Sequence, residues 1–166
     1  FAVGASAERL RWAMDTAQTA RSAAGLDPGT MEFGTYVNVV AHDDPEVARR
    51  LGEGGLSLFA RFQAMHGHTV GPVSTEGKRT TEAIHDAYDM TRHNRAGSPQ
   101  AGRLTSEFAA EFGVFGPSSY CIERLRSLIE MGFTRLMIVG GTREADPAEV
   151  SKAEARFVEE VLPALR

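Results

Sequence analysis

Short apolar runs alternate with helix-type patterns along this chain. The runs Phe1–Val3, Tyr36–Val40 and Leu136–Val139 are each followed by a glycine or polar loop and then by a helical pattern. Runs of this length, followed by loop and helix signals, are typical of buried strands. Their order predicts parallel strands joined by crossover helices, which is an α/β fold.

Four segments carry apolar residues at helical spacing, and we expect these stripes to pack on the sheet rather than to bind a ligand. We expect Gly52, Gly54 and Gly55 to loosen the middle of the second helix, and Asp44 and Asp146, each followed by proline, to cap helices. Asp146 and Glu149 also fit a capping box. The stripes are Leu10, Ala13, Met14, Ala17 and Ala20; Val47, Leu51, Leu58, Phe59 and Phe62; Ile122, Leu125 and Ile129; and Val150, Phe157, Val161 and Leu165.

The chain is interpreted as a single domain, residues 1–166, that carries one long insertion. The segment from about His68 to Pro117 is too long for a simple connection, and such segments are usually lids or binding loops. We expect helical pieces around Ala83–His93 and Ala101–Phe112 within it. The run Gly113–Phe115 is either a small strand or an approach to the next helix.

Composition and charge exclude several classes of function. Apolar residues make up 42% and charged residues 24%, which is typical of a globular protein. The net charge of −4 and the dispersed arginines argue against nucleic-acid binding. No apolar run is long enough to span a bilayer and no signal-peptide pattern is present, so we expect a cytoplasmic protein without membrane association. The single cysteine, Cys121, cannot form an intramolecular disulfide and is interpreted as packing.

The turn Gly4–Ala5–Ser6 is the first candidate binding element. It follows an apolar run and opens a helix, and free N–H groups at a helix N-terminus favour phosphate. A purely structural turn in which Ser6 caps the helix explains the same residues. Gly140–Gly141, after the last apolar run, has the same two interpretations.

The second candidate is a polar group in the insertion. It contains Arg92 and His93, which could contact a substrate through charge and hydrogen bonds. A solvated helix end, where Arg and His favour the dipole, is the competing explanation. His66 and His68 lack further ligands at suitable spacing, so we expect no metal site.

Several segments resemble the luciferase-like monooxygenases. They are residues 112–125 (FGVFGPSSYCIERL), residues 130–141 (EMGFTRLMIVGG) and residues 157–166 (FVEEVLPALR). Residues 88–93 (YDMTRH) resemble the deazaflavin-dependent branch of the family, which includes the methylene-tetrahydromethanopterin reductases.

The resemblance implies the C-terminal part of a (β/α)8 TIM barrel, with the sixth, seventh and eighth strands near Phe1, Val37 and Ile138. It implies that the first five strands lie outside this chain. The implied function is an oxidoreductase that uses FMN or coenzyme F-420 on a small organic substrate. Gly4, Ala5 and Ser6 would then lie near the cofactor phosphate, and Arg92 and His93 near the substrate; no catalytic residue is assigned.

Two alternatives remain open at this stage. The chain could be a non-catalytic α/β fragment, or a degenerate family member that acts in association only. The strand edges of an opened barrel also predict a homo-oligomer, because unpaired edges pair with other chains.

Overall fold

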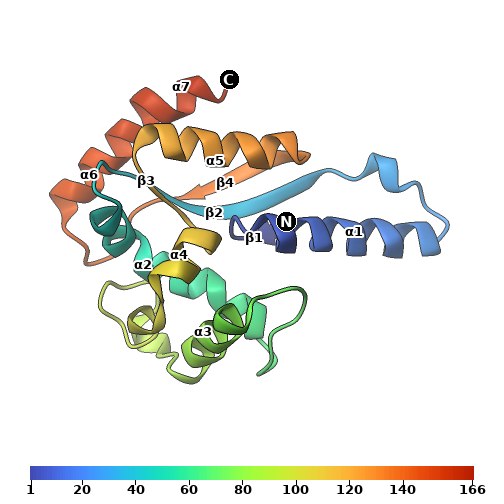
Figure 1. Ribbon diagram of the computed structural model, residues 1–166, viewed down its shortest axis with the longest axis horizontal. Helices are drawn as coiled ribbons and strands as arrows, with labels where there is room; N and C mark the ends of the chain where they lie inside the picture. The colour runs from blue at the N-terminus through green and yellow to red at the C-terminus, as the bar shows by residue number, and fades with distance from the viewer.

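The computed structural model describes all residues, 1–166, and contains one parallel sheet with helices on both faces (Figure 1). The strands are β1 (Ala2–Val3), β2 (Phe33–Ala41), β3 (Val114–Gly116) and β4 (Phe133–Val139). The α-helices are α1 (Ala7–Ala23), α2 (Pro45–Arg61), α3 (Thr75–Asp86), α4 (Ser106–Phe112), α5 (Ser118–Glu130), α6 (Pro147–Arg156) and α7 (Leu162–Ala164), with a π-helical turn at Phe157–Val161 between the last two.

The sheet is organised around β2, which pairs in parallel with all three other strands. Tyr36 pairs with Val3 of β1 and with Met137 of β4, so these two strands lie on opposite edges of β2. β3 pairs further along, where Val40 faces Phe115. The predicted parallel strands are therefore confirmed, and the run Gly113–Phe115 is resolved as a strand. The sheet is open, since β4 pairs with β2 alone.

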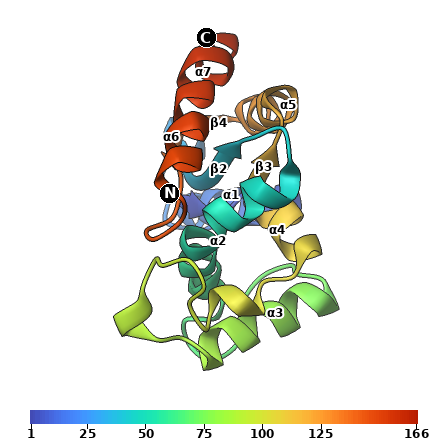
Figure 2. The ribbon, with the colours of Figure 1, turned by 90° about the vertical axis from the view of Figure 1, so that its left-hand side faces the viewer.

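Two apolar cores cover the two faces of β2. Val37, Val39 and Ala41 pack with residues of α1, α5 and the π-helical turn, while Val40 packs with residues of α2, α3 and α4. Successive residues of a strand point to opposite faces, so a buried run of this kind suits a sheet covered on both sides. Figure 2 shows α5, α6 and α7 on one side of the sheet and α2 and α3 on the other.

α2 does not loosen at its glycines, contrary to expectation. The helix is continuous from Pro45 to Arg61, and Gly52, Gly54 and Gly55 are buried in it. A Cβ at Gly52 would lie 2.5 Å from the Phe115 ring, and one at Gly54 would lie 2.3 Å from Thr142. The glycines are there because neighbouring segments pack against the helix backbone.

The apolar stripes of two other helices differ from the expectation. α5 buries Cys121, Leu125 and Leu128, whereas Ile129 is exposed, so the buried stripe is shifted around the helix. α1 buries Leu10 but exposes Ala20, because its second half extends beyond the sheet (Figure 1).

The helices of the insertion also differ from those expected. α3 begins at Thr75, where the Ser74 hydroxyl accepts a hydrogen bond from Gly77 N, and it ends at Asp86. Only a short 3-10 turn, Met90–Arg92, follows before His93. The helix predicted around Ala83–His93 is therefore wrong over most of its length. The second piece is a 3-10 turn at Ala101–Arg103 followed by α4.

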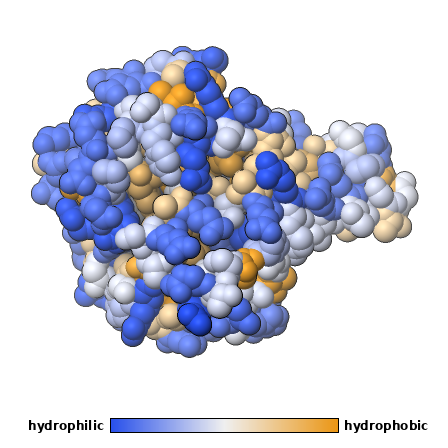
Figure 3. Space-filling view, viewed as in Figure 1, coloured by the Kyte–Doolittle hydropathy of each residue, from blue (hydrophilic) through white to orange (hydrophobic).

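None of the helices combines the length and the apolar character that a membrane span requires. The visible face in Figure 3 is mainly hydrophilic, with small apolar patches. β4 also leaves Met137 and Ile138, which point to opposite faces of the strand, partly exposed. An exposed strand edge of this kind is the feature on which the prediction of a homo-oligomer rests, and it stays a prediction.

We expect Gly54→Ala to destabilise the chain by about 1–3 kcal/mol, although alanine favours a helix by about 1 kcal/mol. The new Cβ would meet the Arg95 backbone at 2.9 Å as well as Thr142. Gly102→Ala is the matched control, because nothing lies within 4 Å of a Cβ at that position. Urea unfolding of both variants measures the difference, and equal stabilities would contradict the close packing at Gly54.

Candidate functional site

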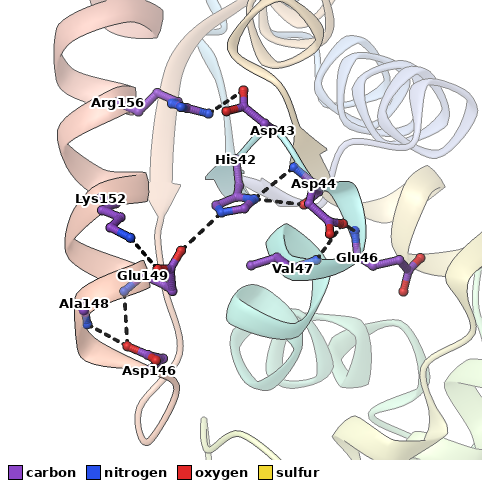
Figure 4. A network of polar contacts seen from close by, with 10 residues as sticks. All are labelled: His42, Asp43, Asp44, Glu46, Val47, Asp146, Ala148, Glu149, Lys152 and Arg156. Carbon is purple, nitrogen blue, oxygen red and sulfur yellow. Dashed lines mark hydrogen bonds and ion pairs between the residues drawn. The ribbon is translucent and has the colours of Figure 1, made fainter.

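The carboxyl ends of the parallel strands bring together loops that are distant in sequence. β2 is followed by His42–Asp44, and β4 is followed by the loop Gly140–Asp146, which leads into α6. In α/β folds, ligands bind at this end of the strands because the loops converge there. The densest polar network of this edge is drawn in Figure 4.

His42 lies at the centre of the network. Its Nδ1 lies 3.0 Å from the backbone N of Asp44, which can only donate, and 3.1 Å from the Asp44 carbonyl oxygen, which can only accept. Its Nε2 lies 3.3 Å from Glu149 Oε2, to which it donates when it carries a proton. The imidazole is therefore held in place between the end of β2 and α6 (Figure 4).

Glu149 is held by two partners. Besides His42, it accepts a hydrogen bond from Lys152 Nζ at 2.6 Å, and this bond is the main cause that lowers the pKa of Glu149. Asp146 caps α6 by accepting from Ala148 N and Glu149 N. The predicted cap is confirmed, but the Glu149 carboxylate bonds to Lys152 and His42, so the reciprocal half of the capping box is wrong.

A second ion pair ties the same loop to α6. Arg156 Nη1 lies 2.6 Å from Asp43 Oδ1, and the hydrogen bond lowers the pKa of Asp43 and raises that of Arg156. Asp44 meanwhile caps α2 through Glu46 N and Val47 N, as predicted. Each of the three residues after β2 thus has a separate structural partner.

Two open cavities flank His42. One, of about 450 Å³, lies against α6 and is lined by polar residues that include Asp43, Lys152 and Arg156. The other, of about 410 Å³, lies between α2, the insertion and the start of α6, and is lined by residues that include Leu51, Ala96 and Glu149. An imidazole oriented by a carboxylate and placed between two cavities has the geometry of a group that transfers protons to a bound ligand.

The insertion reaches this edge through the loop after β4. Ala96 N donates to Arg143 O at 2.9 Å, and Gly97 N donates to Glu53 Oε1 at 3.1 Å. The two non-glycine residues with positive φ, Asn94 at 54° and Glu144 at 66°, lie on the two sides of this junction. Such strained backbone is often found at functional sites, which supports a functional role for the junction.

Arg92 and His93 are both exposed and contact different groups. Arg92 Nη2 lies 3.8 Å from Glu144 Oε2 in the loop after β4, whereas His93 Nδ1 lies 2.9 Å from the Tyr88 hydroxyl. Because α3 ends at Asp86, these residues do not form the end of that helix. Their assignment to a substrate stays a prediction.

The turn Gly4–Ala5–Ser6 is packed by α4. A Cβ at Gly4 would lie 2.4 Å from the Phe112 ring, Ala5 N donates to Phe112 O, and the Ser6 hydroxyl donates to Glu111 at 2.7 Å. Ser6 is the N-cap residue of α1, but its side chain makes no capping bond, so the expected side-chain cap is wrong. The role of this turn toward a phosphate stays a prediction.

Two further side-chain assignments concern metal and thiol chemistry. No group of three or more His, Cys, Asp or Glu side chains is arranged to hold a metal ion. Cys121 is fully buried, and burial raises the pKa of its thiol to about 11. The interpretation of Cys121 as packing is therefore confirmed.

Sequence reasoning missed His42 and Glu149 as a pair. His42 directly follows a recognisable strand and Glu149 lies in the first turn of a recognisable helix. His42 therefore lies at the carboxyl end of a predicted strand, and Glu149 lies in the helix that follows the loop after another, so the rule that ligands bind at this edge could have selected them. Their contact joins residues 107 positions apart, which no local pattern shows.

We expect the free energy of unfolding to fall as pH drops below about 4.5, partly through Glu149 and Asp43. The pKa values of both carboxyls are lowered in the fold, so their contribution is present above the ordinary pKa and is lost as pH falls through the folded one. Glu149→Gln should reduce stability at about pH 6, and its difference from the parent should be smaller at about pH 3. Glu123→Gln, at an exposed position, should change stability little at either pH. Urea unfolding at both pH values checks this. A parent and a Glu149→Gln variant equally stable at the higher pH would contradict it.

The comparisons with known proteins concern the family and the fold. The family model for luciferase-like monooxygenases matches residues 1–135. No curated protein sequence matches the chain. Among solved structures, the chain is similar to the coenzyme F-420-dependent tetrahydromethanopterin reductase from Methanopyrus kandleri, with a TM-score of 0.64 and 15% identity.

This structural match covers 99% of the chain but 44% of the reductase, so the chain spans less than half the length of that relative. At this identity the likeness shows the fold: a parallel α/β sheet with helices, similar to part of a TIM-barrel enzyme. The family match, in contrast, extends over most of the residues. The chain belongs to the luciferase-like monooxygenase family.

Proposed function

We propose that this chain is part of an oxidoreductase that uses coenzyme F-420 or FMN to act on a small organic substrate. The observation that carries the proposal is the carboxyl edge of the sheet, where His42 and Glu149 lie between two open cavities. The family and the structural relative support an oxidoreductase, and the relative's dependence on coenzyme F-420 favours that cofactor over FMN.

The turn at the start of α1 would hold the phosphate end of the cofactor. The Ser6 side chain does not cap α1, so the first-turn N–H groups have no side-chain partner. Free donors of this kind, together with the helix dipole, favour an anion. The Glu111 carboxylate now lies against Ser6 and would have to make room for a phosphate.

The cofactor, when bound, supplies the hydride or oxygen chemistry, and the residues of this chain position the reactants. His42, held by Glu149, would hold or deliver a proton at Nε2 at the cavity edge. The insertion would cover the substrate, with Arg92 and His93 on its outer turn. This arrangement extends the lid role expected for long insertions.

A second candidate function is an association-only role. The unpaired edge of β4, with Met137 and Ile138 exposed, favours it, because such an edge can bind another strand without any cofactor. The two functions differ in cofactor binding, since an association module would ignore both coenzyme F-420 and FMN.

We expect the polypeptide that the gene encodes in full to bind coenzyme F-420 or FMN saturably, as measured by the change in cofactor fluorescence. Ser6→Ala should leave binding within about threefold, whereas Glu111→Gln should tighten it, because a competing carboxylate charge is removed. Binding of neither cofactor would contradict the proposed oxidoreductase and favour the association-only role.

The substrate assignment is tested with His93→Ala in the same polypeptide. We expect KM to rise about 2- to 10-fold, the effect of one lost hydrogen bond, with little change in Tm. Lost thermal stability with normal kinetics would assign His93 to the fold alone.

A further inference from the structure

Arg61, the last residue of α2, is a half-buried cation without a carboxylate partner. It takes part in none of the ion pairs of the chain, and its Nε is buried and has no hydrogen-bond partner. Its Nη1 lies 3.6 Å from the Met90 sulfur, and a thioether is a weak acceptor. The guanidinium also acts on the Tyr88 hydroxyl, whose pKa it lowers against the larger effect of burial. Arg49, Arg79 and Arg156, in contrast, each pair with an acidic side chain.

The guanidinium is nevertheless held in a defined place. Its Cζ lies 4.2 Å from the centroid of the Tyr88 ring, which is a close cation–π contact. The contact joins α2 to the insertion and limits the positions that the guanidinium can take. A planar fork of donors fixed in this way matches the geometry of a carboxylate or phosphate.

A second polar group, His93, contacts the hydroxyl of the same tyrosine. Burial raises the pKa of Tyr88, so its hydroxyl stays protonated and can donate to His93 Nδ1 at 2.9 Å. When Tyr88 donates this bond, the other ring nitrogen of His93, Nε2, is the one that carries a proton, and His93 is exposed. Tyr88 therefore contacts two polar groups: the Arg61 guanidinium over its ring face and the exposed His93 imidazole at its hydroxyl.

One exposed apolar side chain, Met90, contacts Arg61, and two others follow Arg61 in the chain. Met90 is 63% exposed, and Phe62 and Met65, which follow Arg61 in the chain, are 47% and 46% exposed. Charged donors beside exposed apolar side chains suit a small molecule with an anionic group and an apolar body. They do not suit a nucleic acid, which needs an extended basic surface, and the chain has a net charge of −4.

We propose that Arg61, with Tyr88 and His93, forms a binding site for the oxyanion of a small organic molecule, a carboxylate or a phosphate. Arg61 supplies the guanidinium fork, Tyr88 fixes its position, and His93 Nε2 supplies a further donor. This inference rests on the proposed function, in which His93 contacts the substrate, and it specifies that the substrate carries an anionic group. Its binding test needs no cofactor, so this inference and the cofactor proposal can fail separately.

The test is isothermal titration of the polypeptide with benzoate, acetate and inorganic phosphate at low ionic strength. We expect saturable binding, weakened by added sodium chloride, and benzoate stronger than acetate because of the apolar neighbours. Stronger binding of phosphate would identify a phosphate ester as the ligand, whereas stronger binding of benzoate would identify a carboxylate.

Arg61→Met keeps the length of the side chain but removes its charge, and it should weaken binding at least about tenfold. Arg61→Lys should weaken binding less, because a point charge remains. Arg79→Met is the control, since Arg79 is an exposed arginine on α3 paired with Glu76, and its binding should equal that of the parent. The Tm values of all variants show whether any of them has lost folding. If Arg61→Met is unfolded, the binding measured for Arg61→Lys decides whether Arg61 holds the anion.

The inference is overturned if none of the three anions binds saturably to the parent polypeptide. It is also overturned if Arg61→Met and Arg79→Met weaken binding equally, which would mean a general charge effect. Titrating the same variants with coenzyme F-420 and FMN separates the two proposals: Arg61→Met should leave cofactor binding unchanged.

Discussion

The structure depends on β2, because every other strand pairs with it and both apolar cores pack on it. Its nine residues are almost all buried, and the β-branched Val37, Val39 and Val40 suit a pleated surface covered on both faces. Without β2, the short β1 and β3 would have no partner strand, and β4 would lose its only one. The loops at the carboxyl edge would then have no common support.

The second constraint is the close approach of α2 to the sheet and to the insertion. The Phe115 ring packs against the backbone of Gly52, and Thr142 and the backbone of Arg95 pack against Gly54, in space that a Cβ would fill. Thr142 Oγ1 also accepts hydrogen bonds from Gly54 N and Gly55 N. This contact draws the loop after β4 and the insertion together beside His42, so the candidate site follows from packing of the helix backbone.

The sequence predicts the elements that have a local signal. The strands around Val37 and Ile138 have largely apolar runs, and Asp44 and Asp146 have proline next to them, so these features were predictable. The start of α3 has a local signal of a different kind, a serine at the N-cap, which apolar spacing does not reveal. The shifted stripe of α5 depends on which side of the helix faces β2, and this is decided by tertiary packing.

The site was less predictable because its contacts are long-range. The contacts His42–Glu149 and Asp43–Arg156 join the loop after β2 to α6. The cation–π contact of Arg61 with Tyr88 joins α2 to the insertion. No periodicity or spacing rule connects such positions. The role of a glycine is also ambiguous in sequence: at Gly54 it allows close packing within a regular helix, whereas the pattern alone indicated a loosened one.

Native-state hydrogen exchange of the backbone amides tests the central position of β2 most directly. The account predicts that buried amides of Val37, Val39 and Val40 exchange most slowly, at the rate of global unfolding, because exposing them requires both cores to open. Amides of α3 and of the segment around His93 should exchange faster, through local opening. Exchange of the β2 amides as fast as those of the insertion would contradict the account.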